Sequence, residues 1–157
     1  MARSPKKIIE DPVPPIEEDV IELKHISFFH APLLGSQFTY TLISKQDEIQ
    51  EACNVFGLDR KKFQKTHAAS CSLITNEDNE HLCVVFMPED LKKTDTVGAI
   101  ALLTHEITHL KQFILEFMQE DSPSAEFEAY LMQNLIHDLL PKYMEYNLQK
   151  DGTILVS

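Results

Sequence analysis

Residues 94–119 read TDTVGAIALLTHEITHLKQFILEFMQ, and this stretch decides how the rest of the chain is interpreted. Apolar residues recur through it at helical spacing and cover most of its circumference, which predicts one long helix buried in the centre of the fold. Near its middle the helix carries His105, Glu106 and His109. Two imidazoles and a carboxylate are costly to bury without a partner, so these residues are the first candidates for a functional site.

The spacing of the three residues fits a metal site that has its own base. Residues four apart lie one above the other on a helix, so His105 and His109 point the same way and can meet one tetrahedral Zn²⁺. Glu106 lies about 100° around the helix from His105, at the edge of the histidine face. From there it can take the proton of a zinc-bound water without being a ligand. The alternative is that all three are packed, hydrogen-bonded residues of a buried helix.

A catalytic zinc normally has three protein ligands and a water. Residues 121–141, DSPSAEFEAYLMQNLIHDLLP, predict a second helix with a polar stripe formed by Glu126, Tyr130, Gln133 and His137. We interpret Glu126 as the third ligand, and Tyr130 and His137 as candidates to orient a ligand or to donate to the transition state. An ordinary solvated face is the alternative, although the stripe lacks Lys, Arg and Asp. The remaining histidines show no ligand spacing with the first helix and are expected not to bind metal: His25, His30, His67 and His81.

The geometry of the helix pair limits this assignment. In a straight first helix that ends at Gln119, His109 would lie about 15 Å from the end. Glu126 would lie only about 5 Å along an antiparallel second helix. The two side chains can therefore share an ion only if the first helix ends or bends soon after Phe113, or if the helices cross steeply.

The segments before the first helix predict a small sheet. Residues 25–34 (HISFFHAPLL) and 38–44 (FTYTLIS) are rich in β-branched and aromatic residues and predict strands. Residues 68–75 (AASCSLIT) and 82–88 (LCVVFMP) predict a hairpin, and we expect 82–88 to be the sheet edge to which a peptide adds. A short helix is predicted at residues 44–58.

The two ends of the chain differ from the middle. Residues 1–22 hold four of the eight prolines and predict a flexible, acidic arm, which leaves residues 23–157 as the predicted domain. Pro141 is expected to close the second helix, and a turn at Asp151-Gly152 is expected to lead into a last strand.

Composition excludes several classes of function. A formal net charge of -11 argues against nucleic-acid binding, including a role as a DNA-bound regulator. No apolar run is long enough to cross a bilayer, and the basic start lacks the apolar region of a secretory signal. Three cysteines without zinc-knuckle or redox spacing are expected to be reduced thiols, which favours the cytoplasm.

The motifs resemble a known group of enzymes. HEITH is followed 17 positions after His109 (126 − 109) by EFEAY, which resembles the HExxH and later E-x-x-A of the gluzincin zinc metallopeptidases. EFEAYLMQ also resembles the E-x-E-A-Y-x-x-Q of small phage and prophage metallopeptidase-like proteins, and ImmA/IrrE-like peptidases are a more distant likeness. The resemblance covers about residues 97–146. Larger gluzincins often carry Asp where Tyr130 stands, so the resemblance does not extend to its histidine-orienting role.

The resemblance implies a compact α+β zincin, a minimal gluzincin in which a small mixed sheet precedes the HExxH helix and a glutamate helix follows it. It implies that His105, His109 and Glu126 bind Zn²⁺ and that Glu106 is the general base. The expected function is a cytoplasmic, phage-derived metallopeptidase that hydrolyses a protein or peptide substrate. The alternative is a non-catalytic zincin-fold binding or virion-associated protein that docks to an assembly through its N-terminal arm.

Overall fold

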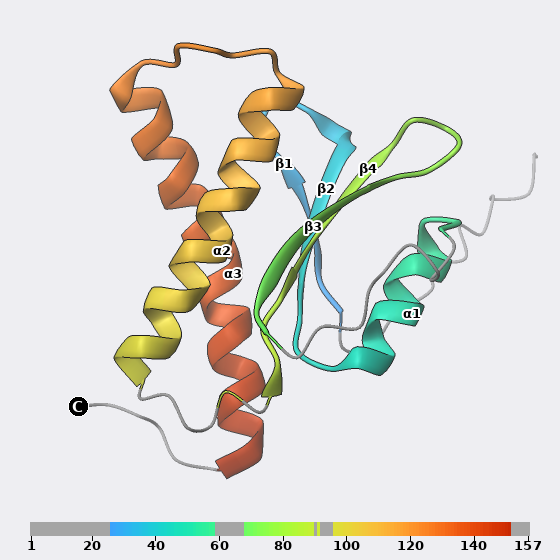
Figure 1. The fold of residues 1–157 in the computed structure, drawn as a ribbon, viewed down its shortest axis with the longest axis vertical. Helices are drawn as coiled ribbons and strands as arrows, with labels where there is room; N and C mark the ends of the chain where they lie inside the picture. Colours follow the sequence, from blue (N-terminus) through green and yellow to red (C-terminus); the bar gives the residue numbers. More distant parts are fainter. Residues whose placement is uncertain (1–25, 59–67, 90, 92–95, 152–157) are drawn as a thin grey trace, which may run out of the picture.

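The computed structural model describes residues 26–58, 68–89, 91 and 96–151, with side chains as far as residue 146 in the last helix. Within these residues a mixed four-stranded sheet combines with three helices, which confirms the predicted α+β class (Figure 1). The elements are β1 (Phe28–Ala31), β2 (Gly35–Ile43), α1 (Gln46–Val55), β3 (Ser70–Thr75), β4 (His81–Phe86), α2 (Thr96–Phe117) and α3 (Ala125–Asp151). The predicted arm at residues 1–22, His25, His67 and the predicted last strand lie outside the described residues.

The sheet has the order β1-β2-β4-β3, in which β2 and β4 are parallel and both outer strands are antiparallel to their neighbours. Because β4 lies inside the sheet, all its residues after the first are buried, and this explains its continuous apolar run. The prediction that residues 82–88 form a sheet edge is therefore wrong. The outer strand of this hairpin is β3, whose residues are mostly half-buried.

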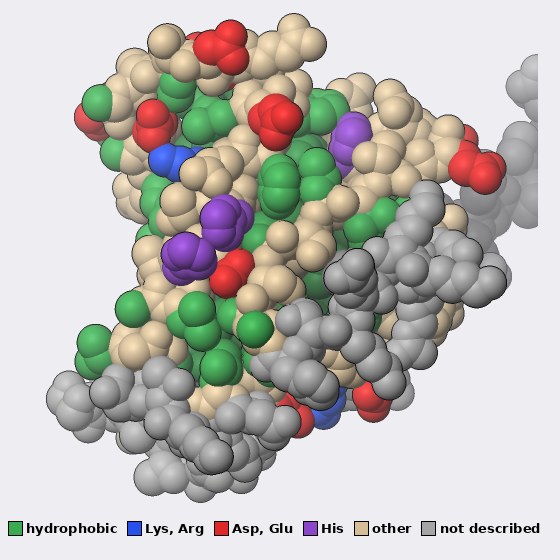
Figure 2. All heavy atoms as spheres, in the orientation of Figure 1, with side chains coloured by type: hydrophobic (Ala, Val, Ile, Leu, Met, Phe, Trp, Pro, Cys, Tyr) green, Lys and Arg blue, Asp and Glu red, His purple; other side chains and the backbone are tan. Residues whose placement is uncertain are grey.

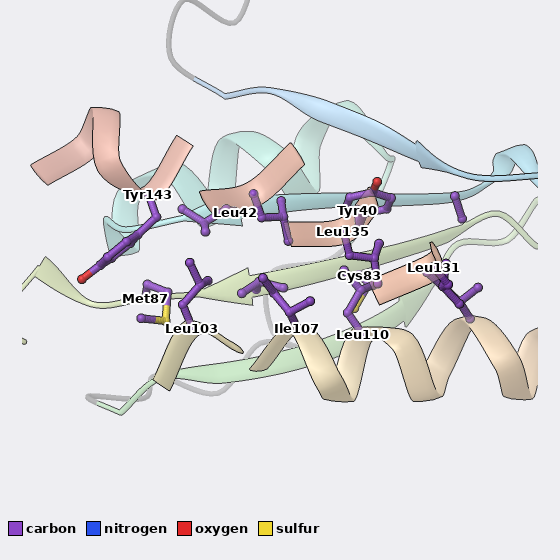
Figure 3. Close-up of a cluster of buried hydrophobic side chains, with 14 of the residues drawn as sticks. Tyr40, Leu42, Cys83, Met87, Leu103, Ile107, Leu110, Leu131, Leu135 and Tyr143 are labelled. Atoms are coloured by element: carbon purple, nitrogen blue, oxygen red, sulfur yellow. The ribbon is translucent and has the colours of Figure 1, made fainter. Parts of the chain in front are cut away.

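The sheet separates two hydrophobic clusters. Successive residues of a strand point to opposite faces, so Leu42 contributes to the cluster under α2 and α3 whereas Ile43 contributes to the cluster under α1. Figure 3 shows the first cluster, in which side chains of both helices meet those of β2 and β4. The molecule thus has three layers, with the candidate metal helix packed on one face of the sheet (Figure 1).

Helix α2 is anchored by a stripe of apolar side chains. Leu103, Ile107, Leu110 and Ile114 are each no more than 1% exposed. Full burial of a side chain of this size stabilises the fold by about 1.5–3 kcal/mol. These contacts fix the position of α2 over the sheet. The opposite face of the helix is left for polar residues.

The helix pair adopts one of the two arrangements that the sequence allowed. Helix α2 continues to Phe117 without a break, so the pair does not adopt the alternative in which the first helix ends soon after Phe113. It closes where Gln119 takes a left-handed conformation (φ 56) and the amide of Glu120 donates to the carbonyl of Leu115. Helices α2 and α3 instead cross each other in Figure 1.

Helix α3 begins and ends later than predicted. The hydroxyl of Ser124 accepts a hydrogen bond from the amide of Phe127 at 3.2 Å, so Ser124 caps the helix. The prediction that Pro141 closes the helix is wrong, since α3 continues through it. Leu139 and Tyr143, on either side of the proline, are buried, and their packing holds the helix across the missing hydrogen bond.

The carboxylate of Glu48, in the first turn of α1, makes the stability of the fold depend on pH. Burial raises its pKa above the ordinary value of 4.5, and its Oε2 has no hydrogen-bond partner among the described residues. The pKa of Glu48 is higher in the folded protein than in the unfolded chain. The free energy that its protonated carboxyl contributes to folding is therefore fully present below the pKa of the unfolded chain, and it is lost as the pH rises through the pKa of the folded protein. We therefore expect Glu48→Gln to be more stable relative to the wild type at pH 7 than at pH 4. Urea unfolding at both pH values measures this, and an equal difference at both would contradict it.

Candidate metal centre

His105 and His109 lie one turn apart on the outward face of α2. Their Nε2 atoms are 3.1 Å apart and their ring centroids 4.8 Å apart. His105 is exposed and His109 is half-buried. Both rings can reach solvent because the histidine positions lie opposite the apolar stripe that holds the helix on the sheet. Figure 2 shows two adjacent histidine side chains at the surface with an acidic side chain beside them.

The distance between the two nitrogens suits a shared metal ion. Two imidazole ligands, each about 2.0–2.1 Å from a tetrahedral zinc, lie about 3.3 Å apart. The observed separation of 3.1 Å between the Nε2 atoms is within a few tenths of an ångström of that value. The same distance allows a hydrogen bond in which one Nε2 donates to the other, so the pair is arranged for either a shared ion or a shared proton.

Glu106 is only 5% exposed, and it is the one charged side chain classed as buried among the described residues. Its side chain is largely covered, but its carboxylate oxygens are not among the buried polar atoms that lack a partner in the described residues. Helical spacing puts Glu106 about 100° from His105, on the side of the helix away from Lys111. The carboxylate therefore borders the histidine pair from one flank without lying between the two rings.

Gln112 was not predicted to have a role, yet it contacts the histidine pair. The Nδ1 of His109 is 3.0 Å from the Oε1 of Gln112, one turn further along α2. An amide oxygen only accepts hydrogen bonds, so this contact favours the His109 tautomer in which Nδ1 carries the proton and Nε2 presents a lone pair. The i, i+3 spacing of His109 and Gln112 is the sequence signal that could have identified this contact.

Glu126 lies in the first turn of α3 and is exposed. No group of three or more His, Cys, Asp or Glu side chains able to hold a metal forms within the described part of the chain, so Glu126 does not join the histidine pair in this structure. Glu128, two residues further along α3, instead forms an ion pair with Lys111, whose Nζ lies 2.6 Å from Oε2. This contact links α3 to α2. That contact was not predicted from the sequence.

Tyr130 and His137 also lie on the solvent side of α3. Tyr130 is 58% exposed, and the side chain of His137 is 86% exposed. His137 lies 3.5 Å from Asp138, whose other carboxylate oxygen accepts a hydrogen bond from the buried phenol of Tyr40. Burial raises the pKa of Tyr40 above its ordinary value, and the hydrogen bond to Asp138 adds to this effect. Within the described residues, neither candidate makes a hydrogen bond or ion pair with the α2 histidines.

The two other described histidines have contacts of a different kind. The Nδ1 of His30 lies 3.0 Å from the hydroxyl of Thr39, and the Nδ1 of His81 lies 2.9 Å from that of Thr75. His81 also packs edge-on against Phe117, with ring centroids 4.7 Å apart. Both are contacts that hold strands and helices together.

Comparisons of the chain with protein-family models, with curated proteins and with solved structures found no match. Among the described residues, no helix is both long enough and apolar enough to span a bilayer.

Proposed function

We propose that the protein is a zinc-dependent metallopeptidase. The observation that carries the proposal is the close approach of the His105 and His109 Nε2 atoms, 3.1 Å apart, next to the buried carboxylate of Glu106. A structural helix has no need for a buried carboxylate beside two converging imidazoles. A hydrolytic zinc site needs both, because the metal requires nitrogen ligands and the water requires a base.

The proposed mechanism assigns one task to each side chain. His105 and His109 would hold the metal through Nε2, and Glu126 would complete the ligand set, as the resemblance implies. Zinc, when bound, would supply acidity to a water and would polarise the scissile carbonyl. Glu106 would accept a proton from the attacking water at a carboxylate oxygen and would return it to the leaving amine. Gln112 keeps the lone pair of His109 on the ligand nitrogen.

The outer strand β3 offers a place where a peptide substrate can add to the sheet. In the described residues β3 pairs only with β4, so the other side of its backbone offers open N–H and C=O groups. An extended peptide can add to such an edge by main-chain hydrogen bonds. β3 also packs against α2, which carries the histidines. We infer that a protein or peptide substrate binds along β3, the strand that replaces residues 82–88 in this role.

The zincin fold is part of the same proposal. The order of elements supports it, since the strands of the sheet precede α2 and the helix that carries Glu126 follows directly. A cytoplasmic, phage-derived enzyme remains the proposed setting.

Zinc analysis of the purified protein tests the proposal directly. After zinc loading and desalting, the wild type should carry about one zinc per chain, and His109→Ala should carry almost none, because a catalytic site needs three protein ligands. His30→Ala is the matched control, since this exposed histidine bonds Thr39 far from the pair along the chain. A wild type that stays empty after loading would refute the zinc assignment.

Gln112→Leu is expected to weaken zinc binding by about 10–100-fold, the usual effect of removing an outer partner of a histidine ligand. Without the acceptor, the His109 proton is free to occupy either ring nitrogen. Nitrogen NMR of the zinc-free protein should show this tautomer shift, and Gln112→Glu should prevent it. Gln37→Leu, the same change at an exposed position of β2, is the control. An unchanged tautomer in Gln112→Leu would exclude the positioning role.

A second candidate is a zincin-fold protein that binds a partner or a virion without catalysis. The observation in its favour is that Glu126 is exposed and does not join the histidines within the described residues. A site with two ligands can hold a structural or transient ion without activating water. Replacement of Glu106 separates the two functions, as argued below.

A further inference from the structure

Two cysteines of the β3–β4 hairpin lie in contact. Cys71 pairs with Val85 and Leu73 pairs with Cys83, so both cysteines point to the same face of the sheet, one diagonal step apart. Their Sγ atoms are 3.3 Å apart. Both side chains belong to the hydrophobic cluster under α2 and α3, and Cys83 is drawn there in Figure 3.

The environments of the two thiols differ in a way that assigns them different roles. Cys83 is fully buried in the interior strand, and burial raises the pKa of its thiol. Cys71 is half-buried on the outer strand β3, where solutes can approach it. An oxidant reaches the half-buried thiol of Cys71 more readily than the fully buried thiol of Cys83. Cys71 therefore reacts first and Cys83 second.

We propose that Cys71 and Cys83 form a reversible intramolecular disulfide when the protein meets a hydroperoxide. The Cys71 thiolate attacks one peroxide oxygen, the O–O bond breaks, and Cys71 becomes a sulfenic acid while the peroxide leaves as alkoxide or hydroxide. The Cys83 sulfur then attacks the Cys71 sulfur, and the sulfenic hydroxyl leaves as water with the Cys83 proton. The two electrons lost by the cysteines reduce the peroxide. A dithiol reductant reverses the reaction by thiol exchange.

The position of Cys71 at the sheet edge makes bond formation feasible. A disulfide requires the sulfur atoms to approach to about 2.05 Å, so the gap must shrink by roughly 1.3 Å. In the described residues β3 is held by ladder hydrogen bonds on one side only, and it can slide or twist over β4 more easily than an interior strand. The proposal is independent of the zinc site and would stand without it.

Cys53 provides an internal control. It is buried in the other hydrophobic cluster, under α1, on the opposite face of the sheet from Cys83. A reaction that depends on the contact between Cys71 and Cys83 must spare it. Nonselective oxidation of thiols would not favour the pair formed by Cys71 and Cys83.

The experiment treats the reduced, full-length protein with hydrogen peroxide, removes the oxidant and alkylates the remaining thiols in denaturant. We expect a monomer that has lost two of its three alkylation sites and the mass of two hydrogen atoms. Peptide mapping should link the Cys71 strand to the Cys83 strand, and dithiothreitol should restore all three sites. Cys53→Ser should lose both of its remaining sites, and Cys71→Ser should keep both of its own. Cys83→Ser should lose only the Cys71 site, which should gain one oxygen atom as a sulfenic acid and form no intramolecular link.

Several outcomes would overturn the proposal. These are retention of all three thiols, a link that includes Cys53, a disulfide dimer, or added oxygen atoms without loss of hydrogen. The same treatment in denaturant should remove the selectivity for the pair, because the contact exists only in the folded sheet. Equal selectivity in denaturant would also contradict the role of the fold.

Discussion

Replacement of Glu106 with Gln is expected to leave zinc bound and to lower peptide hydrolysis by about 10²–10⁴-fold, the usual contribution of a general base. Gln has nearly the same shape and can fill the same buried position, where Glu106 is 5% exposed. It cannot accept the proton of the attacking water. The loss should therefore appear in kcat while the zinc content stays unchanged.

The measurement compares cleavage of an unfolded protein substrate by the wild type and the variant, with zinc content determined on the same samples. Glu116→Gln is the matched control, because it makes the same change at an exposed position of the same helix. If the wild type binds zinc but neither protein cleaves any substrate, the binding-protein alternative is favoured. If Glu106→Gln retains full activity, the base has been assigned to the wrong residue.

The same substitution should also reveal how the helix tolerates a buried charge. The neutral amide removes a negative charge from a largely covered position of α2 without changing the shape of the side chain. We therefore expect Glu106→Gln to unfold at the same or higher denaturant concentration than the wild type. Such a trade-off between activity and stability is common where an active site requires a buried polar group.

The sequence predicted the parts of the fold that depend on local periodicity. The apolar spacing of residues 94–119 identified α2, and its i, i+4 histidines were expected to meet, as they do. The order of strands could not be predicted in the same way. Both strands of the β3–β4 hairpin are apolar, and only their pairing in the folded sheet shows that β4 is interior.

The helix boundaries were missed because packing outweighed local signals. Pro141 normally ends a helix, but the buried side chains of Leu139 and Tyr143 continue on the same face of α3. The helix begins after Ser124, whose hydroxyl accepts a hydrogen bond from the Phe127 amide, and not at the start of the predicted range 121–141. Such choices depend on where the sheet surface lies, which no local pattern reports.

Within the site, the sequence was most informative about α2 and least informative about α3. The pairing of His105 with His109 follows from one helix alone. The contact between Lys111 and Glu128 depends on how two helices cross, and so it could not be read from either segment. The polar stripe that begins at Glu126 predicted a metal-facing surface, yet its members are exposed.

The two glutamates in the first turn of α3 can be compared directly as candidates for the third zinc ligand. Glu126→Ala is expected to reduce zinc affinity by more than the roughly 10–100-fold typical of outer-sphere changes, because it removes a coordinating carboxylate. Glu126 makes no hydrogen bond or ion pair with the described residues, so its side chain is available to a metal. Glu128 forms an ion pair with Lys111, with Nζ 2.6 Å from Oε2. Glu128→Ala should therefore reduce zinc affinity by no more than roughly 10–100-fold.

Competition with a chelating dye in the zinc-free protein gives both affinities on one scale, and circular dichroism checks that each variant folds. The two variants remove the same side chain two positions apart on one helix, so general effects of lost negative charge cancel. A larger loss in Glu128→Ala would mean that the Lys111 ion pair opens and that Glu128 is the ligand. Equal, small losses would mean that α3 supplies no ligand, and the centre would then hold its ion through His105 and His109 alone, which is too few protein ligands for the proposed hydrolase.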